Sequence, residues 1–152
     1  MSRQDETRRD SAAVGSALYG LATRAVRRLP RDLSLTSAAT LATLDRTGPR
    51  RITDLAVSEG VTQPAMTVLV RVMEESGLVE RRGDPSDRRV TLVCLTKAGA
   101  SYVRARRQAG VDAYAQLIDE LTDDEVEALV AALPALVHLA ELESQDREGS
   151  KQ

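Results

Sequence analysis

Glycine and proline interrupt this chain at five places, and the segments between them carry a regular apolar spacing that loops do not have. The breaks divide the 152 residues into six helical candidates and one short strand pair, without an internal repeat. They fall at Leu29-Pro30, Gly48-Pro49, Gly60, Gly77 and Gly83-Asp84-Pro85. The sequence therefore predicts a mainly α fold with a small β-hairpin, built around one core.

The first three segments predict one long helix and two shorter ones. Residues 10–29 place apolar side chains at three- and four-residue spacing, which gives a helix with one apolar face. The second helix begins near Thr36, as N-cap, and ends at Gly48. The third starts at Thr53 and stops at Gly60.

The fourth predicted helix has the clearest boundaries. The hydroxyl of Thr62 can cap it, Pro64 lies in its first turn, where a missing N–H costs little, and Gly77 ends it. A fifth helix runs from Thr96, again a capping residue, towards Leu117.

The third and fourth helices have the spacing of a helix-turn-helix. Ala56 is small enough for the two helices to cross closely, and Gly60 can supply the positive φ of a tight turn. Val61, Met66 and Leu69 would then pack the second helix onto the first.

Between Leu78 and Leu95 the apolar period changes to two, around a polar tip at residues 82–89, and this predicts a hairpin. Arginine suits phosphates and the narrow minor groove because its planar fork donates paired hydrogen bonds and stays charged. A turn that needs only solubility would accept Lys, Glu or Asp equally well. Four arginines and no lysine therefore favour nucleic-acid binding: Arg81, Arg82, Arg88 and Arg89.

Charge is distributed unevenly along the chain. The formal net charge is −2, but residues 119–148 hold ten acids against one base, a balance of −9. The remaining residues hold 20 bases against 13 acids, a balance of +7. The sixth helix, which follows the capping box Thr122-Asp-Asp-Glu125, is therefore acidic. A basic body with an acidic terminal segment is compatible with nucleic-acid binding by the body.

Several classes of protein are excluded by what the sequence lacks. Cys94 is the only cysteine and His138 the only histidine, so one chain cannot form a disulfide, a Cys-rich zinc site or a paired-histidine site. No segment approaches the roughly 18 apolar residues of a membrane span, and the N-terminus has no apolar signal core. We expect a cytoplasmic protein that is not an enzyme, with no catalytic residues, metal or cofactor.

Three motifs together carry a specific resemblance. They are Gly77-Leu78-Val79-Glu80-Arg81, then Asp84-Pro85-Ser86-Asp87-Arg88-Arg89, then Leu95-Thr96-Lys97-Ala98-Gly99. In order and spacing they resemble the MarR family of winged helix-turn-helix transcriptional regulators. Gln63-Pro64-Ala65-Met66-Thr67 is similar to the start of that family's recognition helix. The match covers residues 12–143.

The resemblance implies a domain organisation and partners. A winged helix-turn-helix domain at 35–95 would bind DNA, and residues 10–34 and 96–143 would form a helical dimerisation region. Residues 1–9 and 144–152 would be flexible tails. Two chains would bind a near-palindromic double-stranded operator as a homodimer, and an effector would change the affinity of this repressor.

The resemblance also assigns DNA-binding residues. Arg89 corresponds to the wing arginine of the minor groove, and Asp87 to the acid that helps to hold it. Val68 stands where the family often has arginine, and Arg71 where it often has aspartate, so Arg71 is expected at a phosphate. The predicted DNA-binding residues are Thr62, Gln63, Pro64, Ala65, Thr67, Val68, Arg71, Asp87, Arg88 and Arg89.

Three tyrosines and the cysteine have two interpretations each. Tyr19, Tyr102 and Tyr114 are the only aromatic residues, and they either line an effector site for a small phenolic compound or pack in the core or an interface. Cys94 is either a redox switch or a buried small apolar residue, and its apolar strand favours burial. His138 is expected to be exposed.

Two hypotheses of function remain at this point. The first is a sequence-specific, dimeric DNA-binding regulator, with its own second copy, an operator and a small-molecule effector as partners. The second is a helical protein-interaction module that uses its acidic C-terminal helix. The arginine-tipped hairpin favours the first, since a helical binding module has no need of it.

Overall fold

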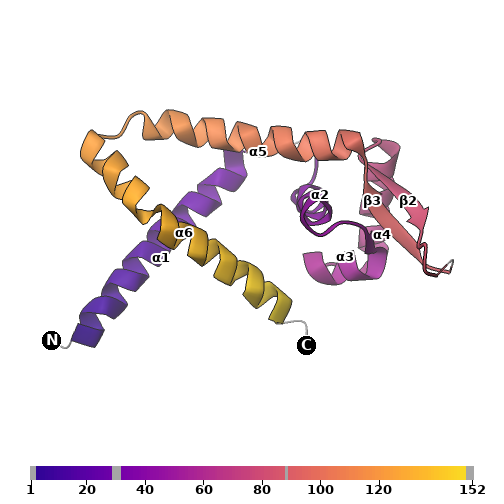
Figure 1. Cartoon of the computed structure of the whole chain (residues 1–152), viewed down its shortest axis with the longest axis horizontal. Helices are drawn as coiled ribbons and strands as arrows, with labels where there is room; N and C mark the ends of the chain where they lie inside the picture. The colour runs from indigo at the N-terminus through magenta and orange to yellow at the C-terminus, as the bar shows by residue number, and fades with distance from the viewer. Residues whose placement is uncertain (1–2, 29–31, 88, 150–152) are drawn as a thin grey trace. The chain divides into compact units, whose positions relative to one another are not determined.

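The computed structural model describes residues 3–28, 32–87 and 89–149 of the chain. It is mostly helical with one small sheet, which confirms the predicted fold class. The chain divides into two compact units, residues 1–110 and 111–152. The order of elements is α1 (Arg3–Arg28), α2 (Leu35–Thr47), β1 (Arg50–Arg51), α3 (Ile52–Glu59), α4 (Gln63–Glu75), β2 (Val79–Gly83), β3 (Thr91–Leu95), α5 (Lys97–Ile118) and α6 (Asp123–Gly149) (Figure 1).

The two terminal helices are longer than predicted. Residues 3–9, expected as a flexible tail, belong to α1, and α6 continues past residue 143 to Gly149. Neither Gly nor Pro occurs at residues 3–14 or 135–148, so nothing in those segments stops a helix. No helix of the described residues is long and apolar enough to cross a membrane.

Hydroxyl caps begin the helices close to where the sequence placed them. The Thr62 Oγ1 accepts a hydrogen bond from the Ala65 N–H at 3.4 Å, as predicted for α4. The capping box of α6 is confirmed, because the Thr122 N–H donates to Glu125 Oε2 at 2.9 Å. The N-cap of α2 is Ser34 rather than the expected Thr36, and its hydroxyl accepts from the Ser37 N–H.

The sheet has a third strand that the sequence did not predict. Strand β1 lies antiparallel to β3, and the order across the sheet is β1-β3-β2. Its two residues, Arg50 and Arg51, pair with Val93 and Leu92. Two adjacent arginines cannot display a period of two in hydrophobicity, so this strand forms because tertiary structure brings it to the edge of β3.

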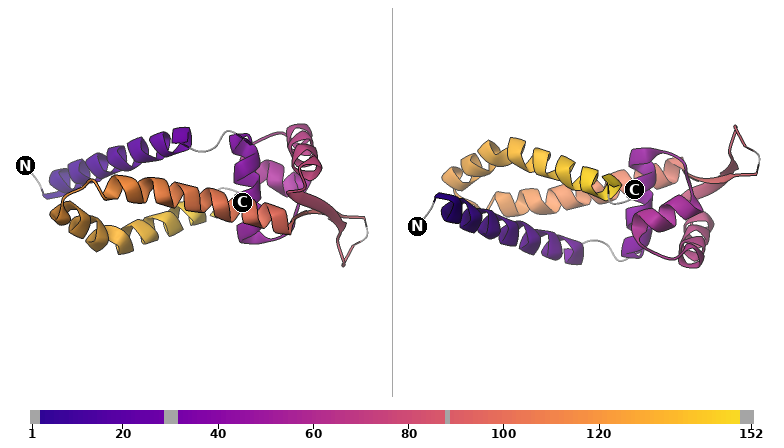
Figure 2. Two further views of the ribbon diagram at one scale, coloured as in Figure 1. Left: turned by 90° about the horizontal axis from the view of Figure 1, so that it is seen from above. Right: turned by 90° about the horizontal axis from the view of Figure 1, so that it is seen from below.

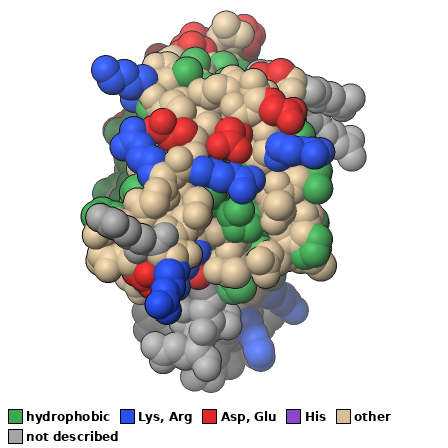
Figure 3. Space-filling view, turned by 90° about the vertical axis from the view of Figure 1, so that its right-hand side faces the viewer, with side chains coloured by type: hydrophobic (Ala, Val, Ile, Leu, Met, Phe, Trp, Pro, Cys, Tyr) green, Lys and Arg blue, Asp and Glu red, His purple; other side chains and the backbone are tan. Residues whose placement is uncertain are grey.

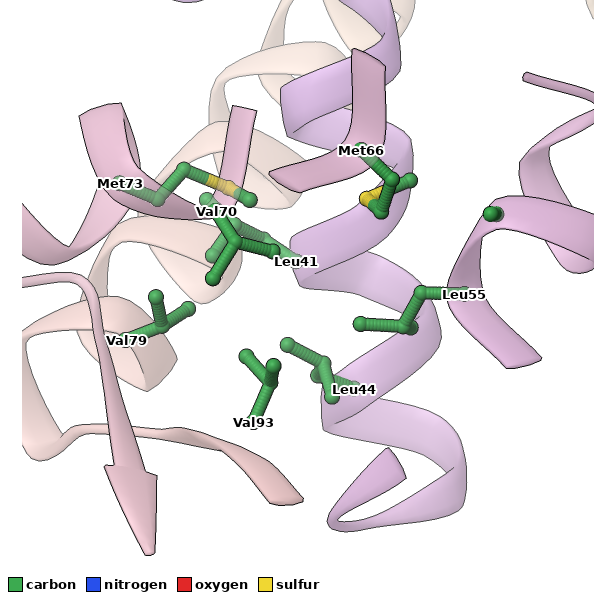
Figure 4. Close-up of a cluster of buried hydrophobic side chains, with 9 residues drawn as sticks. Leu41, Leu44, Leu55, Met66, Val70, Met73, Val79 and Val93 are labelled. Carbon is green, nitrogen blue, oxygen red and sulfur yellow. The ribbon is translucent and has the colours of Figure 1, made fainter. Parts of the chain in front are cut away.

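Residues 35–95, the winged part of the chain, share an aliphatic core that joins α2, α3, α4 and the sheet. The fully buried side chains of the three helices and the sheet point towards one another (Figure 4). Methionine and leucine fill the space that aromatic side chains take in other cores. The main members are Leu41, Leu44, Leu55, Met66, Val70, Met73, Val79 and Val93.

The predicted helix-turn-helix is present. Gly60 follows α3 in the left-handed conformation, at φ 66° and ψ 32°, and the Val61 N–H donates to the Ala56 carbonyl at 3.0 Å. Ala56 and Met66 are buried, and Val61 and Leu69 pack against the core. The turn therefore needs glycine for its backbone angle.

A second glycine turn joins α4 to β2. Gly77 has a φ of 71°, and the Leu78 N–H donates to the Met73 carbonyl at 2.9 Å, as in a Schellman motif. The Thr96 hydroxyl donates to the Gly77 carbonyl at 2.7 Å and accepts from the Gly99 N–H at 3.0 Å. One threonine thus caps α5 and fixes the start of β2.

Gly99 is required by close packing. A Cβ on Gly99 would lie 2.1 Å from the Leu78 carbonyl oxygen and 2.8 Å from Leu95 Cδ1. We expect Gly99→Ala to lower the free energy of unfolding by about 1–3 kcal/mol, because backbone has to move. Urea denaturation at equal protein concentrations measures this loss.

Gly110→Ala in the same helix is the matched control. Nothing lies within 4 Å of a Cβ there, so the change should leave stability equal or raise it by up to about 1 kcal/mol. Equal midpoints for the two variants would contradict the close packing at Gly99.

Candidate nucleic-acid interface

The buried residues of α4 determine which of its residues face outwards. Met66, Val70 and Met73 are completely buried, so the remaining positions of the helix turn away from the core. The predicted residues on and next to α4 are all exposed: Thr62, Gln63, Pro64, Ala65, Thr67, Val68 and Arg71. The first turn of the helix is therefore open to a partner.

Two of these side chains already have contacts within the chain. The Thr67 hydroxyl donates to the Gln63 carbonyl at 2.9 Å, which engages the hydroxyl and leaves the methyl group of this exposed residue for apolar contact. Arg71 Nε lies 3.8 Å from Glu75 Oε1, one turn along the helix, and both side chains are about two-thirds exposed. Such a pair is weak, so a phosphate could take the place of Glu75.

The β2–β3 hairpin extends beyond the helices of the winged part (Figure 2). Its tip is held by Asp84, whose carboxylate accepts from the Ser86 N–H at 2.8 Å and from the Ser86 hydroxyl at 2.6 Å. These bonds lower the pKa of Asp84, the hydroxyl contributing most, and the charge of Arg51 adds to the shift. The turn is closed by hydrogen bonds from Asp84 N–H to the Val90 carbonyl and from Val90 N–H to the Asp87 carbonyl.

The Asp87 carboxylate holds the backbone of Arg89. Its Oδ1 accepts from the Arg89 N–H at 2.9 Å, and both side chains are exposed at the tip. This bond positions the backbone of Arg89, whose side chain is exposed. Arg88 lies outside the described residues.

The other two arginines of the hairpin pair with carboxylates of the protein. Arg81 Nε lies 3.2 Å from Glu74 Oε2 on α4, and Arg82 pairs with Glu80 on the same strand. Figure 3 shows basic and acidic side chains interspersed over this end of the molecule. The three described arginines of this group therefore have different partners.

The winged domain carries no excess of positive charge. Residues 35–95 contain eight bases and eight acids, so the excess predicted for the body comes from the segments before and after them in the sequence. Net charge therefore gives this domain no attraction to DNA, and the positions of individual arginines have to supply it. Arg50 and Arg51 are exposed arginines of this domain that the sequence did not single out. A strand of two residues is too short to show an alternating apolar pattern.

The tyrosines differ in environment. Tyr19 on α1 is exposed, and Tyr114 lies on α5 in the second unit. Tyr102 packs against the core, and its hydroxyl donates to Asp32 Oδ1 at 3.0 Å and accepts from Arg106 Nη1 at 3.2 Å. Partial burial raises the pKa of Tyr102, and the bond to Asp32 adds to the shift.

Cys94 and His138 have the surroundings that the sequence favoured. Cys94 is buried and His138 is exposed on α6. Among the described residues, no group of three His, Cys, Asp or Glu side chains could hold a metal ion.

Comparison with known proteins identifies this arrangement. The family model described as MarR family matches residues 33–91, which span α2 to the start of β3. An HTH-type transcriptional regulator of Mycobacterium bovis is 31% identical over 126 residues, which cover 77% of this chain and 88% of that protein. The chain belongs to the MarR family. It is a DNA-binding transcriptional regulator.

Two Escherichia coli members of the MarR family extend the comparison. The homoprotocatechuate degradative operon repressor is 31% identical over 100 residues, which cover 65% of this chain and 67% of the repressor. The crystal structure of apo MarR has a TM-score of 0.62 at 26% identity and covers 80% of this chain and 95% of that one. Proteins of the MarR family bind DNA and act as dimers.

The wing tip should respond to pH through Asp84. Its pKa lies below the ordinary value of 3.8, so its contribution to the order of the tip is complete above that value and is lost as pH falls through the lowered pKa. We expect Ser86→Ala to raise this pKa towards 3.8, because the strongest hydrogen bond is removed. Carboxyl NMR titration measures both values, and an unchanged pKa in the variant would contradict the assignment.

Proposed function

We propose that the protein represses transcription as a homodimer on a near-palindromic operator and that a small-molecule effector changes its affinity. The observation that supports this most is that the first turn of α4 and Arg89 at the tip of the hairpin are both exposed. The proposal places the protein in the cytoplasm and gives it no catalytic role.

Exposed apolar side chains on the terminal helices support a dimer. In the single chain Val14 of α1 is 58% exposed, and Leu133 and Val137 of α6 are 53% and 57% exposed. Series of such side chains usually mark a surface that another protein covers. The proposed dimerisation region is residues 10–34 and 96–143, on either side of the winged domain at 35–95.

Bases would be read by the first turns of α4 in the major groove. Gln63 can pair with the edge of an adenine, while Pro64, Ala65, the Thr67 methyl and Val68 can contact thymine methyl groups. Thr62 lies at the helix N-terminus, where backbone N–H groups favour a phosphate. Arg71 would add a phosphate contact in place of its weak pair with Glu75.

The wing would enter the adjacent minor groove. Arg88 and Arg89 would meet the concentrated negative potential of a narrow, A·T-rich groove. Asp87 would orient Arg89 through the backbone bond described above.

The proposed effector is a small aromatic or phenolic compound. The relative from Escherichia coli is named for repressing a homoprotocatechuate degradative operon. In this chain the hydroxyl of Tyr102 donates to Asp32 and accepts from Arg106, and its second lone pair could accept a hydrogen bond from a phenol. Tyr19 and Tyr114 are the other aromatic candidates for the site.

Selection from random duplexes tests the proposal. We expect an inverted repeat with half-site centres about 10 bp apart, because a two-fold dimer places its recognition helices in successive major grooves. Sedimentation of the complex should give two chains per site. Affinity for the selected site no better than for random DNA at physiological salt would refute sequence-specific regulation.

Substitutions on α4 should separate reading of bases from attraction to phosphates. Gln63→Ala should relax specificity at one base pair per half-site and cost about 1–3 kcal/mol of binding free energy. Arg71→Ala should weaken binding to all sequences and flatten the dependence on salt. Titrations on the selected site and on each single-base variant, at several salt concentrations, measure both effects. Identical profiles for the two variants would overturn this division of roles.

A further inference from the structure

Among the described residues, an ion pair connects α4, the recognition helix, to strand β2 of the wing. Glu74 lies near the end of α4 and Arg81 in β2, and their side chains meet at 3.2 Å between Glu74 Oε2 and Arg81 Nε. The two side chains are 39% and 36% exposed, so the pair is half-buried. The turn at Gly77 reverses the chain between them and brings the two residues together.

Two neighbouring ion pairs do not connect elements. Arg71 and Glu75 belong to the same helix, and Glu80 and Arg82 belong to the same strand. Neither pair can therefore hold the hairpin against α4. The pair of Glu74 and Arg81 has the same charges, but it joins two different elements, α4 and β2.

The angle between wing and helix matters because both have to reach DNA together. From Arg81 the hairpin continues for three more residues to Asp84, or about 10 Å at the usual rise of a strand, before the tip begins. A small rotation at Arg81 therefore moves the tip sideways along the DNA. At this level β3 is held by its pairing with β1, whereas β2 is the edge strand, so a contact from α4 to β2 can limit the rotation that remains.

We propose that the ion pair between Glu74 and Arg81 fixes the angle of the wing to the recognition helix, and so sets the spacing that the operator needs between half-site and A·T-rich flank. This inference rests on the proposed function. Glu74 and Arg81 are positioning residues and make no contact with DNA. Arg81 is thereby removed from the group of arginines that bind phosphate.

The proposal predicts an effect opposite to that of simple charge. Glu74→Gln removes a negative charge close to DNA, so electrostatics alone predicts tighter binding to every duplex. If the pair orients the wing, the same variant binds the selected operator about two- to fivefold more weakly, in the range of a partly exposed ion pair. Glu80→Gln is the matched control, because it removes the same charge from a pair that does not reach α4.

The experiment uses the full-length dimer and a series of duplexes. Each duplex carries the selected half-sites, with the A·T-rich flank displaced by zero, one or two base pairs. We expect wild type and Glu80→Gln to prefer one distance between the half-site and the A·T-rich flank. Glu74→Gln should bind the duplexes of all three distances with nearly equal affinity. The double exchange Glu74→Arg with Arg81→Glu should restore the preference, and urea denaturation verifies that every variant is folded.

The outcomes distinguish this inference from the function on which it rests. A wild-type spacing preference that survives in folded Glu74→Gln would overturn the inference alone. Tighter binding of Glu74→Gln to all spacings would also overturn it and would make Arg81 a phosphate contact. If wild type shows no spacing preference and Arg89→Ala binds as tightly as wild type, the proposed role of the wing itself fails.

Discussion

The burial of one stripe of α4 determines the rest of the recognition surface. Met66, Val70 and Met73 lie against α2, α3 and the sheet, and this contact fixes the rotation of the helix about its own axis. Since a helix has 3.6 residues per turn, the intervening positions have to face outwards. The exposure of the base-reading candidates is therefore a consequence of core packing.

The second constraint is the junction where α4, β2 and α5 meet. The Thr96 hydroxyl bonds the Gly77 carbonyl, and Gly99 allows α5 to pass close to Leu78. This junction fixes the base of the wing, whereas its outer part depends on side-chain contacts such as the one from Glu74 to Arg81. The base of the wing is thus held by backbone and core contacts, and its tip by the local hydrogen bonds of Asp84 and Asp87.

Because the winged domain has no net charge, its binding to DNA depends on the positions of individual arginines. With eight bases and eight acids in residues 35–95, the domain has no net positive charge, and the half-buried pair with Glu74 engages Arg81. The exposed arginines that remain include Arg50 and Arg51 in β1, Arg71 on α4 and Arg89 at the tip. A domain of this kind gains specificity because few contacts form on an unmatched sequence.

The sequence by itself determined the helices, the helix-turn-helix and the hairpin, because capping residues, Gly60 and Gly77, and apolar periods act over a few neighbouring residues. It also indicated the exposed turn of α4 and the arginine-rich tip. Only the tertiary structure decided that β1 joins the sheet, that Arg81 meets Glu74 and that Asp32 meets Tyr102. These contacts join residues of different elements, and no local pattern encodes which side chains the packed core brings together.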